Sequence, residues 1–496
     1  MRKVKKLIGV LLAAVMVLAM GVTVFAEGNP TISAPDNGHT YEVYQIFTGD
    51  YSEGDNSQKV LSNVKWGKNG TGTQGNNVSE EILTKLKNAN GSDTEQLAVI
   101  KTYANLQSSN KFGTVTSESP LQVPSGYYLI KDVDGSQENE QDSYTLYIVQ
   151  VVGENITIAP KADVPESKKK VDDKNDSDTS EDGESWQDSA DYDIGDHVPY
   201  QLTAMLPYNV SDYTSYTLKF VDTMSSGLTY DEKSAEVFVN GTSAGKLEPV
   251  SAVYSGEEAK YKDGTVLTWD LGDIKAERYN AGNNAVITIK YTATLNNNAV
   301  MGSAGNPNKM HIEFSNNPNG EGTGQTPDDT NIVFTYKVVV NKVDEENVPL
   351  PGAQFTLQKK QANGSWEDIG SATVSENQAT FTFSGLDDGD YKLIETVTPD
   401  GYNDIADIEF TITAEHKILS DDPQLTSLTG NTTTGEITFT PNTSNGSLTT
   451  NVENKSGAEL PETGGMGTTI FYVLGAILVI GAGVLLIVRR RTGSEK

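Results

Sequence analysis

Apolar residues recur at every second position through most of this chain, which is the spacing of side chains on one face of a β-strand. Short runs rich in valine, isoleucine, tyrosine and phenylalanine alternate with turns rich in glycine and asparagine. Many short strands separated by such turns are typical of antiparallel sandwiches. We therefore predict a mainly β protein, built from tandem immunoglobulin-like β-sandwiches in an elongated rod.

The pattern divides the chain into three regions, because 496 residues are too many for one hydrophobic core. The first region, residues 27–161, combines strands with two short helices. Ser79 opens one helix, and Ser92 with Glu95 forms a capping box that opens the other. The expected strands of this region are 39–47, 126–130 and 144–152.

The second and third regions, residues 162–335 and 336–459, lack a long amphipathic helix, so each is expected to form a sandwich. The expected strands of the second region are 197–206, 216–222, 236–240, 266–271, 285–295 and 310–314. Those of the third region are 335–343, 354–359, 380–383, 391–397, 408–413, 436–440 and 448–452.

Both ends of the chain carry longer apolar runs of another kind. Basic residues at positions 2–6 precede an apolar stretch that closes on Val24-Phe25-Ala26, with the small residues that a signal peptidase reads. That stretch is long enough for an anchor, but the cleavage-site residues favour removal. We predict a signal peptide over residues 1–26 and a mature chain that starts at Glu27.

Near the other end, residues 470–488 form an uncharged apolar run. Its length matches the roughly 20 residues that one helical membrane crossing needs. Arg489, Arg490 and Arg491 follow, and cationic residues stay on the cytoplasmic side. The sequence therefore predicts a transmembrane helix with a cytoplasmic tail, residues 489–496.

The formal net charge of −31 changes what the rod can bind. Eight of the 37 basic residues but only one of the 68 acidic residues lie in the two terminal signals, so the part between them is more acidic still. Such a chain will not bind nucleic acid by neutralising phosphates, and its charge suits solubility at an outer surface. There is no cysteine, so an exported chain of this length must be stabilised without disulfides.

Metal ligands are not obvious in the sequence. The four histidines, His39, His197, His311 and His416, lie far apart without metal-ligand spacing, and we expect surface or packed side chains. In the acidic segment 172–184, Asp178, Asp182 and Gly183 match the start of a calcium loop, but position twelve is Ser189 instead of glutamate. A solvated linker is the preferred interpretation, and we predict no metal site and no cofactor.

Strand parity singles out three polar residues on apolar faces of the third region. Lys342 follows Val338 and Val340 in phase, and Glu395 lies between Leu393 and Val397. On the last strand Asn454 is in phase with Leu448, Thr450 and Val452. Burying these groups unpaired is costly, so they are expected to meet.

Two interpretations of the contact among these three side chains are open. One is a buried ion pair bonded to an amide. The other is covalent: an apolar core disfavours the charged forms of amine and carboxyl, so the neutral amine is a nucleophile and the protonated carboxyl can polarise the amide through its oxygen. Attack by Lys342 on Asn454 would release ammonia and leave an isopeptide bond.

Two segments of the third region carry a family resemblance. Residues 340–357 resemble the opening of a collagen-adhesin B-type domain, and residues 391–402 resemble the pilin E-box, with Thr398 where alanine is usual. In that family the lysine, the E-box glutamate and a late asparagine form an autocatalytic crosslink. The resemblance implies Lys342, Glu395 and Asn454, with Asn451 as the alternative amide.

The second region offers a parallel set. Residues 190–196 and 220–228 resemble the central, A-type domain of backbone pilins. Asp222 follows Leu218 and Phe220 on one face and is the expected acid. Asn316, in phase with Met310, Ile312 and Phe314, is the expected amide. The amine is Lys169, which is in phase with Val171, in preference to Lys170.

Three further segments resemble parts of sortase-assembled pilins. Residues 40–67 resemble the N-terminal domain of backbone pilins. Leu460-Pro461-Glu462-Thr463-Gly464 resembles the LPXTG sorting signal, which a transpeptidase cleaves after threonine before passing the threonine carbonyl to an amine. Residues 155–161 resemble the pilin motif, in which a lysine after proline is that amine, although Ala159 replaces the usual aromatic residue. The implied amine is Lys161, which we expect to be exposed and mobile.

Together the resemblances imply the shaft subunit of a Gram-positive pilus, secreted and held transiently in the membrane before attachment at the cell wall. Its implied partners are pilin-class and housekeeping sortases, other copies of itself, minor tip and base pilins, and peptidoglycan, with host ligands left open. Each crosslink forms once, so the chain is not a turnover enzyme. The alternative is a monomeric wall-anchored adhesin that binds host matrix. No nucleophile–histidine arrangement supports a hydrolase.

Overall fold

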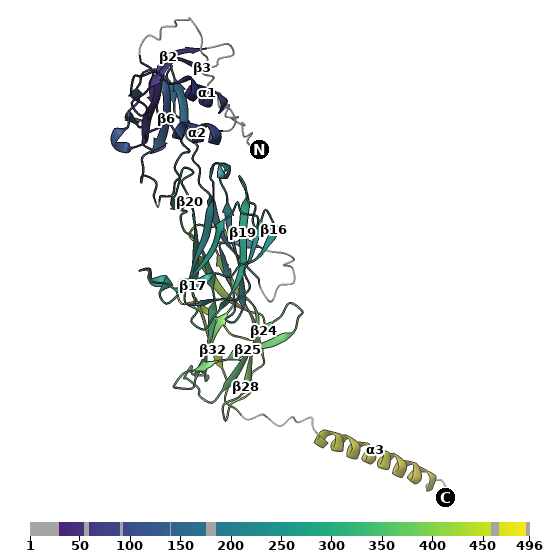
Figure 1. Cartoon of the computed structure of the whole chain (residues 1–496). Helices are drawn as coiled ribbons and strands as arrows, with labels where there is room; N and C mark the ends of the chain where they lie inside the picture. Colours follow the sequence, from purple (N-terminus) through teal and green to yellow (C-terminus); the bar gives the residue numbers. More distant parts are fainter. Residues whose placement is uncertain are drawn as a thin grey trace.

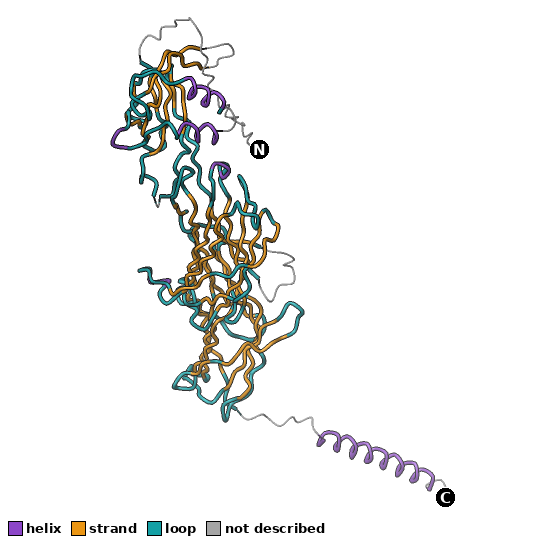
Figure 2. The backbone as a smooth tube through the Cα atoms, in the orientation of Figure 1, coloured by secondary structure: helices purple, strands orange, loops and turns teal. Residues whose placement is uncertain are grey.

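The computed structural model describes residues 29–53, 59–89, 93–138, 140–174, 185–457 and 466–492. Three β units follow one another along an elongated molecule, and one helix lies apart at the C-terminal end (Figure 1). Strands dominate the central and C-terminal units, whereas the first unit also carries helices (Figure 2). The predicted mainly β rod is confirmed.

The first unit contains two sheets and two short α-helices. The smaller sheet has the order β5-β1-β8 and the larger one β3-β2-β6-β7, with β4 paired to β2. Its strands are β1 (Thr31–Ser33), β2 (Tyr41–Glu53), β3 (Lys59–Trp66), β4 (Gly113–Val115), β5 (Leu121–Gln122), β6 (Gly126–Asp132), β7 (Ile148–Val152) and β8 (Ile156–Thr157). Its helices are α1 (Glu80–Asn88), α2 (Asp93–Lys101) and the 3-10 turn η2 (Ser108–Asn110). Both helices begin next to the predicted starts.

The central unit is a sandwich of two seven-stranded sheets. One has the order β10-β9-β12-β19-β15-β16 with β14 on β19. Its strands are β9 (Glu166–Asp172), β10 (Trp186–Gln187), β12 (His197–Met205), β14 (Leu228–Tyr230), β15 (Glu236–Val239), β16 (Thr242–Lys246) and β19 (Val286–Leu295).

The facing sheet of the central unit has the order β11-β22-β20-β13-β18-β17 with β21 on β20. Its strands are β11 (Ser189–Asp191), β13 (Thr217–Met224), β17 (Val250–Val253), β18 (Thr265–Asp273), β20 (Asn306–Ser315), β21 (Thr323–Gln325) and β22 (Asp329–Phe334). Two 3-10 turns, η3 (Val210–Asp212) and η4 (Ala259–Tyr261), lie in its connections. Strand β20 begins four residues before the predicted start at Met310, and this difference matters for the site below.

The C-terminal unit is a sandwich of two five-stranded sheets, β26-β27-β23-β32-β31 and β25-β24-β28-β29-β30. The first comprises β23 (Tyr336–Val343), β26 (Thr373–Val374), β27 (Thr380–Leu386), β31 (Thr440–Asn442) and β32 (Ser447–Glu453). The second comprises β24 (Gln354–Lys360), β25 (Trp366–Ser371), β28 (Gly389–Val397), β29 (Ile408–His416) and β30 (Leu425–Thr432). The strand predicted at 436–440 is wrong: only Thr440 is in a strand, and Leu425–Thr432, which was not predicted, forms β30.

The central and C-terminal units meet closely. Gly302 and Gly446 both have positive φ, and a Cβ on Gly302 would lie 2.3 Å from the Gly446 nitrogen. Side chains at these two positions would therefore push the units apart. The Ile194 amide also donates to the Gly385 carbonyl across the junction, at 3.0 Å.

Helix α3 (Met466–Thr492) follows the C-terminal unit. Its segment Phe471–Arg490 is long and apolar enough to cross a membrane, by length and composition. It packs against no other described part of the chain, as Figure 1 shows. This agrees with the predicted transmembrane run.

Candidate crosslink sites

The C-terminal site joins the first and last strands of its sandwich. β23 and β32 are parallel neighbours, and Lys342 lies opposite Val452. The Lys342 Nζ donates to the Val452 carbonyl at 3.0 Å and contacts Oδ1 of Asn454, which follows β32. Both side chains are fully buried.

The acid comes from the facing sheet. Glu395, on β28, places Oε1 3.6 Å from the Lys342 Nζ, and its Oε2 accepts a hydrogen bond from the Asn454 Nδ2 at 3.0 Å. The Asn454 Nδ2 also donates to the Asn403 carbonyl at 3.0 Å. One amine, one carboxyl and one amide therefore meet in the core. The carboxyl contacts the amide nitrogen, whereas we expected it to polarise the amide through its oxygen.

Burial decides the charge state of the amine. It lowers the pKa of Lys342, and the neighbouring Glu395 carboxyl opposes this effect in part. A larger fraction of the amine is therefore neutral, and hence nucleophilic, than at the surface. The alternative amide, Asn451, is exposed and accepts a hydrogen bond from Asn341 instead.

The central site pairs the two sheets of its sandwich. Lys169 on β9 places Nζ 2.5 Å from Oδ1 of Asp222 on β13, and both side chains are fully buried. Burial lowers the pKa of Lys169, with Asp222 acting in the opposite direction. Lys170 points elsewhere, since its Nζ lies 2.5 Å from the Asp188 carboxylate. Of the two lysines, only Lys169 contacts the acid.

The amide that lies beside the central group is that of Asn308, whereas the expected Asn316 lies elsewhere. Met310 pairs with Asp222, so Asn316, beyond the end of β20, lies about 20 Å along the strand direction from the acid. The Asn316 Nδ2 instead donates to the Gln137 and Asp142 carbonyls of the first unit, at 2.6 and 3.3 Å. Asn308 has the same strand parity as Asn316, but it lies only two residues before Met310, opposite Met224.

Tyr291, on β19, connects the three groups of the central site. Its hydroxyl donates to Oδ2 of Asp222 at 2.5 Å and accepts from the Asn308 Nδ2 at 2.8 Å and the Lys169 Nζ at 3.3 Å. One donor and two acceptor positions exhaust what a hydroxyl offers. Sequence reasoning missed Tyr291, although a tyrosine in phase with Ile287 and Ile289 was a visible signal of a polar group facing the core.

Three family models match the chain. Residues 194–318 match the Gram-positive pilin backbone subunit 2, Cna-B-like domain. Residues 336–424 match the SpaA prealbumin-like fold domain, and residues 452–492 match the LPXTG cell wall anchor motif. The chain carries the domains of a Gram-positive backbone pilin. The resemblance is thereby confirmed, although the model for residues 194–318 is described as Cna-B-like where the sequence suggested an A-type domain.

A curated relative of this pilin is the trypsin-resistant surface T6 protein of Streptococcus pyogenes serotype M6. It is 27% identical over 360 residues, which are 60% of this chain and 65% of the relative, just under two thirds of its length.

Two solved structures resemble the pilin more distantly. The T6 backbone pilin of serotype M6 Streptococcus pyogenes aligns with 18% identity and a TM-score of 0.49, over 87% of this chain and 98% of that one. The full-length major pilin SpaD of Corynebacterium diphtheriae aligns with 16% identity and a TM-score of 0.47, over 88% and 99%. The family assignment rests on the sequence matches.

Lys161 of the pilin lies between β8 and β9, where the first and central units meet. It is half-buried instead of exposed. Its amide donates to the Thr145 hydroxyl at 2.6 Å, and its carbonyl accepts from the Leu146 amide and the Asn209 side chain, both at 3.3 Å. These contacts hold the backbone of Lys161 in place, contrary to the mobility that we expected.

The terminal signals of the pilin fall largely outside the described residues. The signal peptide, residues 1–26, and the sorting motif Leu460–Gly464 are among them, as are Asp178, Asp182 and Gly183 of the acidic segment. The anchor match over residues 452–492 nevertheless identifies the chain as a cell wall surface protein with an apolar C-terminal helix.

The histidines occupy four different settings. His197 is exposed, and the side chain of His311 is only partly buried. His39 is buried between Asp132 and Asp142, each at 2.8 Å, and these hydrogen bonds raise its pKa to about 9. His416 lies at the junction of the central and C-terminal units, near two aspartates that no sequence spacing had linked to it.

Proposed function

We propose that the chain is the shaft subunit of a covalently polymerised surface pilus, in which Thr463 of one copy is joined by a sortase to Lys161 of the next. Buried lysine–asparagine isopeptide bonds stiffen each subunit. The observation that carries this proposal is the contact of Lys342, Glu395 and Asn454 in the apolar core of a pilin domain.

The C-terminal crosslink needs no external reactant. The neutral Lys342 Nζ attacks the Asn454 Cγ, and the new N–C bond replaces the Cγ–Nδ2 bond. Glu395 takes a proton from Nζ through one carboxyl oxygen and delivers a proton to Nδ2 through the other. Ammonia leaves, and an amide links the two side chains.

Formation of the central crosslink needs one more group, the Tyr291 hydroxyl. Asp222 contacts the Lys169 Nζ, and the Tyr291 hydroxyl, which hydrogen-bonds both, connects the Asp222 carboxyl to the Asn308 Nδ2. Asp222 therefore takes the proton from Nζ, while Tyr291 accepts a proton from Asp222 and donates its own to the departing nitrogen. The products are again one amide and one ammonia.

The polymerisation step is tested by blotting wall extracts. Wild-type cells are expected to give a ladder of high-mass bands that Lys161→Ala removes. Lys168→Ala removes an exposed lysine on the neighbouring strand β9; it is the matched control and should keep the ladder. A single band that neither substitution changes would overturn the shaft proposal and favour a monomeric wall-anchored adhesin.

The crosslinks are tested separately by intact mass. The mature chain is expected to be lighter than its sequence by two ammonia molecules, one for each site. Glu395→Ala should restore one of them, and Asp222→Ala the other. A chain of full sequence mass would reject the covalent interpretation and leave two buried ion pairs, whatever the blot shows.

A further inference from the structure

Five carboxylates gather at the junction between the central and C-terminal units. Asp173, Asp191 and Asp193 come from the central unit. Asp387 and Asp388 come from the turn that joins β27 to β28. Among the described residues, the cationic groups facing them are Lys359, whose Nζ lies 2.6 Å from Asp193 and 3.2 Å from Asp387, and His416.

Three of these carboxylates converge. One oxygen each from Asp191, Asp387 and Asp388 lies within 4.8 Å of the others. A cation with ligand distances of about 2.3–2.6 Å can contact three oxygens at such separations. Because Asp191 belongs to one unit and the other two to its neighbour, no single unit could form this arrangement.

One carboxylate oxygen at this place is buried without a hydrogen-bond partner. The Asp191 Oδ2 is inaccessible, and the residue is only 4% exposed. The neighbouring Tyr336 hydroxyl is buried as well, and burial, followed by Asp191, raises the pKa of Tyr336. An unpaired oxygen in a dry core is costly, and a cation would satisfy it.

These carboxylates also lie close together in a largely buried place. Like charges in such a low-dielectric site either take up protons or share a counter-ion.

We propose that Asp191, Asp387 and Asp388 bind a divalent cation of the calcium class, which joins the central and C-terminal units. The all-oxygen ligand set suits a hard cation, whereas the neighbouring group with His416 adds a nitrogen. The sequence predicted no metal because its ligands are far apart along the chain. Waters would complete the coordination shell.

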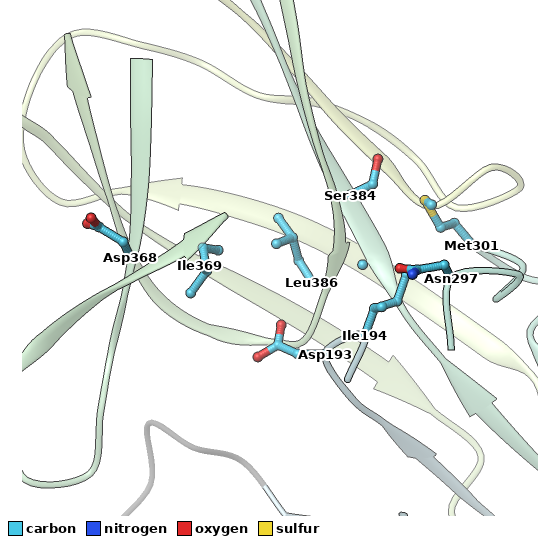
Figure 3. A pocket seen from close by; sticks show the side chains of 9 residues that line it. Asp193, Ile194, Asn297, Met301, Asp368, Ile369, Ser384 and Leu386 are labelled. Carbon is cyan, nitrogen blue, oxygen red and sulfur yellow. The ribbon is translucent and has the colours of Figure 1, made fainter. Parts of the chain in front are cut away.

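A cleft lies beside this group of carboxylates. Asp193, Ile194, Ser384 and Leu386 line it, and Figure 3 shows Asp193 and Ile194 of the central unit beside Leu386 of the C-terminal unit. Leu386 directly precedes the ligand Asp387.

Calorimetric titration of the mature chain with calcium chloride, after treatment with a chelator, tests the site. One equivalent is expected to bind, and magnesium at least tenfold more weakly. Asp388→Asn, at a half-buried position, should weaken calcium binding at least tenfold. Asp390→Asn, two residues away and outside the cluster, should leave it unchanged.

A second measurement distinguishes a loss of calcium binding from misfolding of the variant. Calcium is expected to raise the unfolding temperature of the wild type and of Asp390→Asn, but not that of Asp388→Asn, with all three chains first shown to be folded by circular dichroism. Absence of calcium binding to the wild type, or equal binding by Asp388→Asn, would overturn the proposal. Neither result bears on polymerisation or on the isopeptide bonds.

Discussion

Each of the two candidate crosslink sites of this pilin combines a lysine and an asparagine with an acidic side chain, and the two acidic side chains differ in length. In the C-terminal unit the longer glutamate, Glu395, contacts both the amine and the amide. In the central unit the shorter aspartate, Asp222, contacts the amine, and the Tyr291 hydroxyl spans the remaining gap to Asn308. The comparison teaches that one missing methylene can be replaced by a hydroxyl from a neighbouring strand.

The sites also differ in what they enclose. The C-terminal bond that we propose would tie the first strand, β23, to the residue after the last strand, β32, so its loop would contain nearly the whole unit. The proposed central bond would tie the first strand, β9, to β20, which would leave β21 and β22 outside the loop. Tension along the shaft would therefore bypass most of both sandwiches but pass through residues 309–341.

The largest expected effect is mechanical. With the Lys169–Asn308 bond intact, residues 170–307 cannot extend under force. Asn308→Ala should release them and add about 45–50 nm of contour length at full extension. Single-molecule force spectroscopy of the mature chain measures this gain.

Asn316→Ala is the matched control for that experiment. It removes the amide that sequence parity selected and should leave the wild-type extension, because Asn316 contacts the first unit instead. A gain with Asn316→Ala and none with Asn308→Ala would reverse our assignment of the central amide.

The next effect is thermodynamic. Asn454→Ala removes the bond that closes a loop between residues 112 positions apart, and loop entropy assigns such a bond about 4–5 kcal/mol of unfolding free energy. Denaturant titration should show this loss in the transition of the C-terminal unit. Asn451→Ala, on the exposed side of the same strand, should change the unfolding free energy by less than about 0.5 kcal/mol.

A third prediction concerns the hydroxyl bridge. Tyr291→Phe should slow or prevent the central crosslink and leave the C-terminal one complete, as tandem mass spectrometry of tryptic peptides would report. Tyr230→Phe is the control, since the Tyr230 ring packs against the Tyr291 ring with centroids 5.9 Å apart, but its hydroxyl donates to Glu248 at 3.1 Å instead of to the crosslink groups.

The same variant offers a rescue that sharpens the comparison. Asp222→Glu in the Tyr291→Phe background restores the missing reach and should recover part of the central bond. Complete crosslinking in Tyr291→Phe alone would show that the hydroxyl only fills space.

The smallest expected effect is a pH dependence of stability in the first unit, for which we propose no crosslink. Aspartate contacts raise the folded-state pKa of His39 from 6.5 to about 9. The resulting stabilisation is complete below pH 6.5. It is lost as the pH rises to about 9, because over this range the unfolded state binds fewer protons than the folded state. Calorimetry should show that the unfolding free energy of the first unit falls by up to about 3 kcal/mol between pH 6 and pH 10. His39→Gln should remove this dependence on pH.

Sequence reasoning reached the C-terminal triad in two ways. Lys342 and Asn454 follow valines and leucines in strict phase, so side-chain parity alone places both in the core. The alternation of β28 ends at Glu395, where the pairing with β24 shifts and Val397 is exposed, so this residue was identified by the E-box resemblance.

The central amide was missed for a local reason. Residues 306–309, Asn-Pro-Asn-Lys, contain no β-branched or aromatic residue, so the strand was predicted to begin at Met310. Pairing with β13 and β22 extends it to Asn306, which is a tertiary effect that propensity does not contain. The junction carboxylates were invisible for a different reason, since only the docking of two units brings them together.

The loop enclosed by Lys342 and Asn454 has a further consequence for survival outside the cell. Once the crosslink has formed, a protease that cuts any one peptide bond between these residues opens the loop but does not divide the chain, because its two halves remain joined through the side chains. The same holds between Lys169 and Asn308. Severing a shaft built in this way with a single cut is therefore possible only in the stretches between the loops, where the backbone is the sole connection.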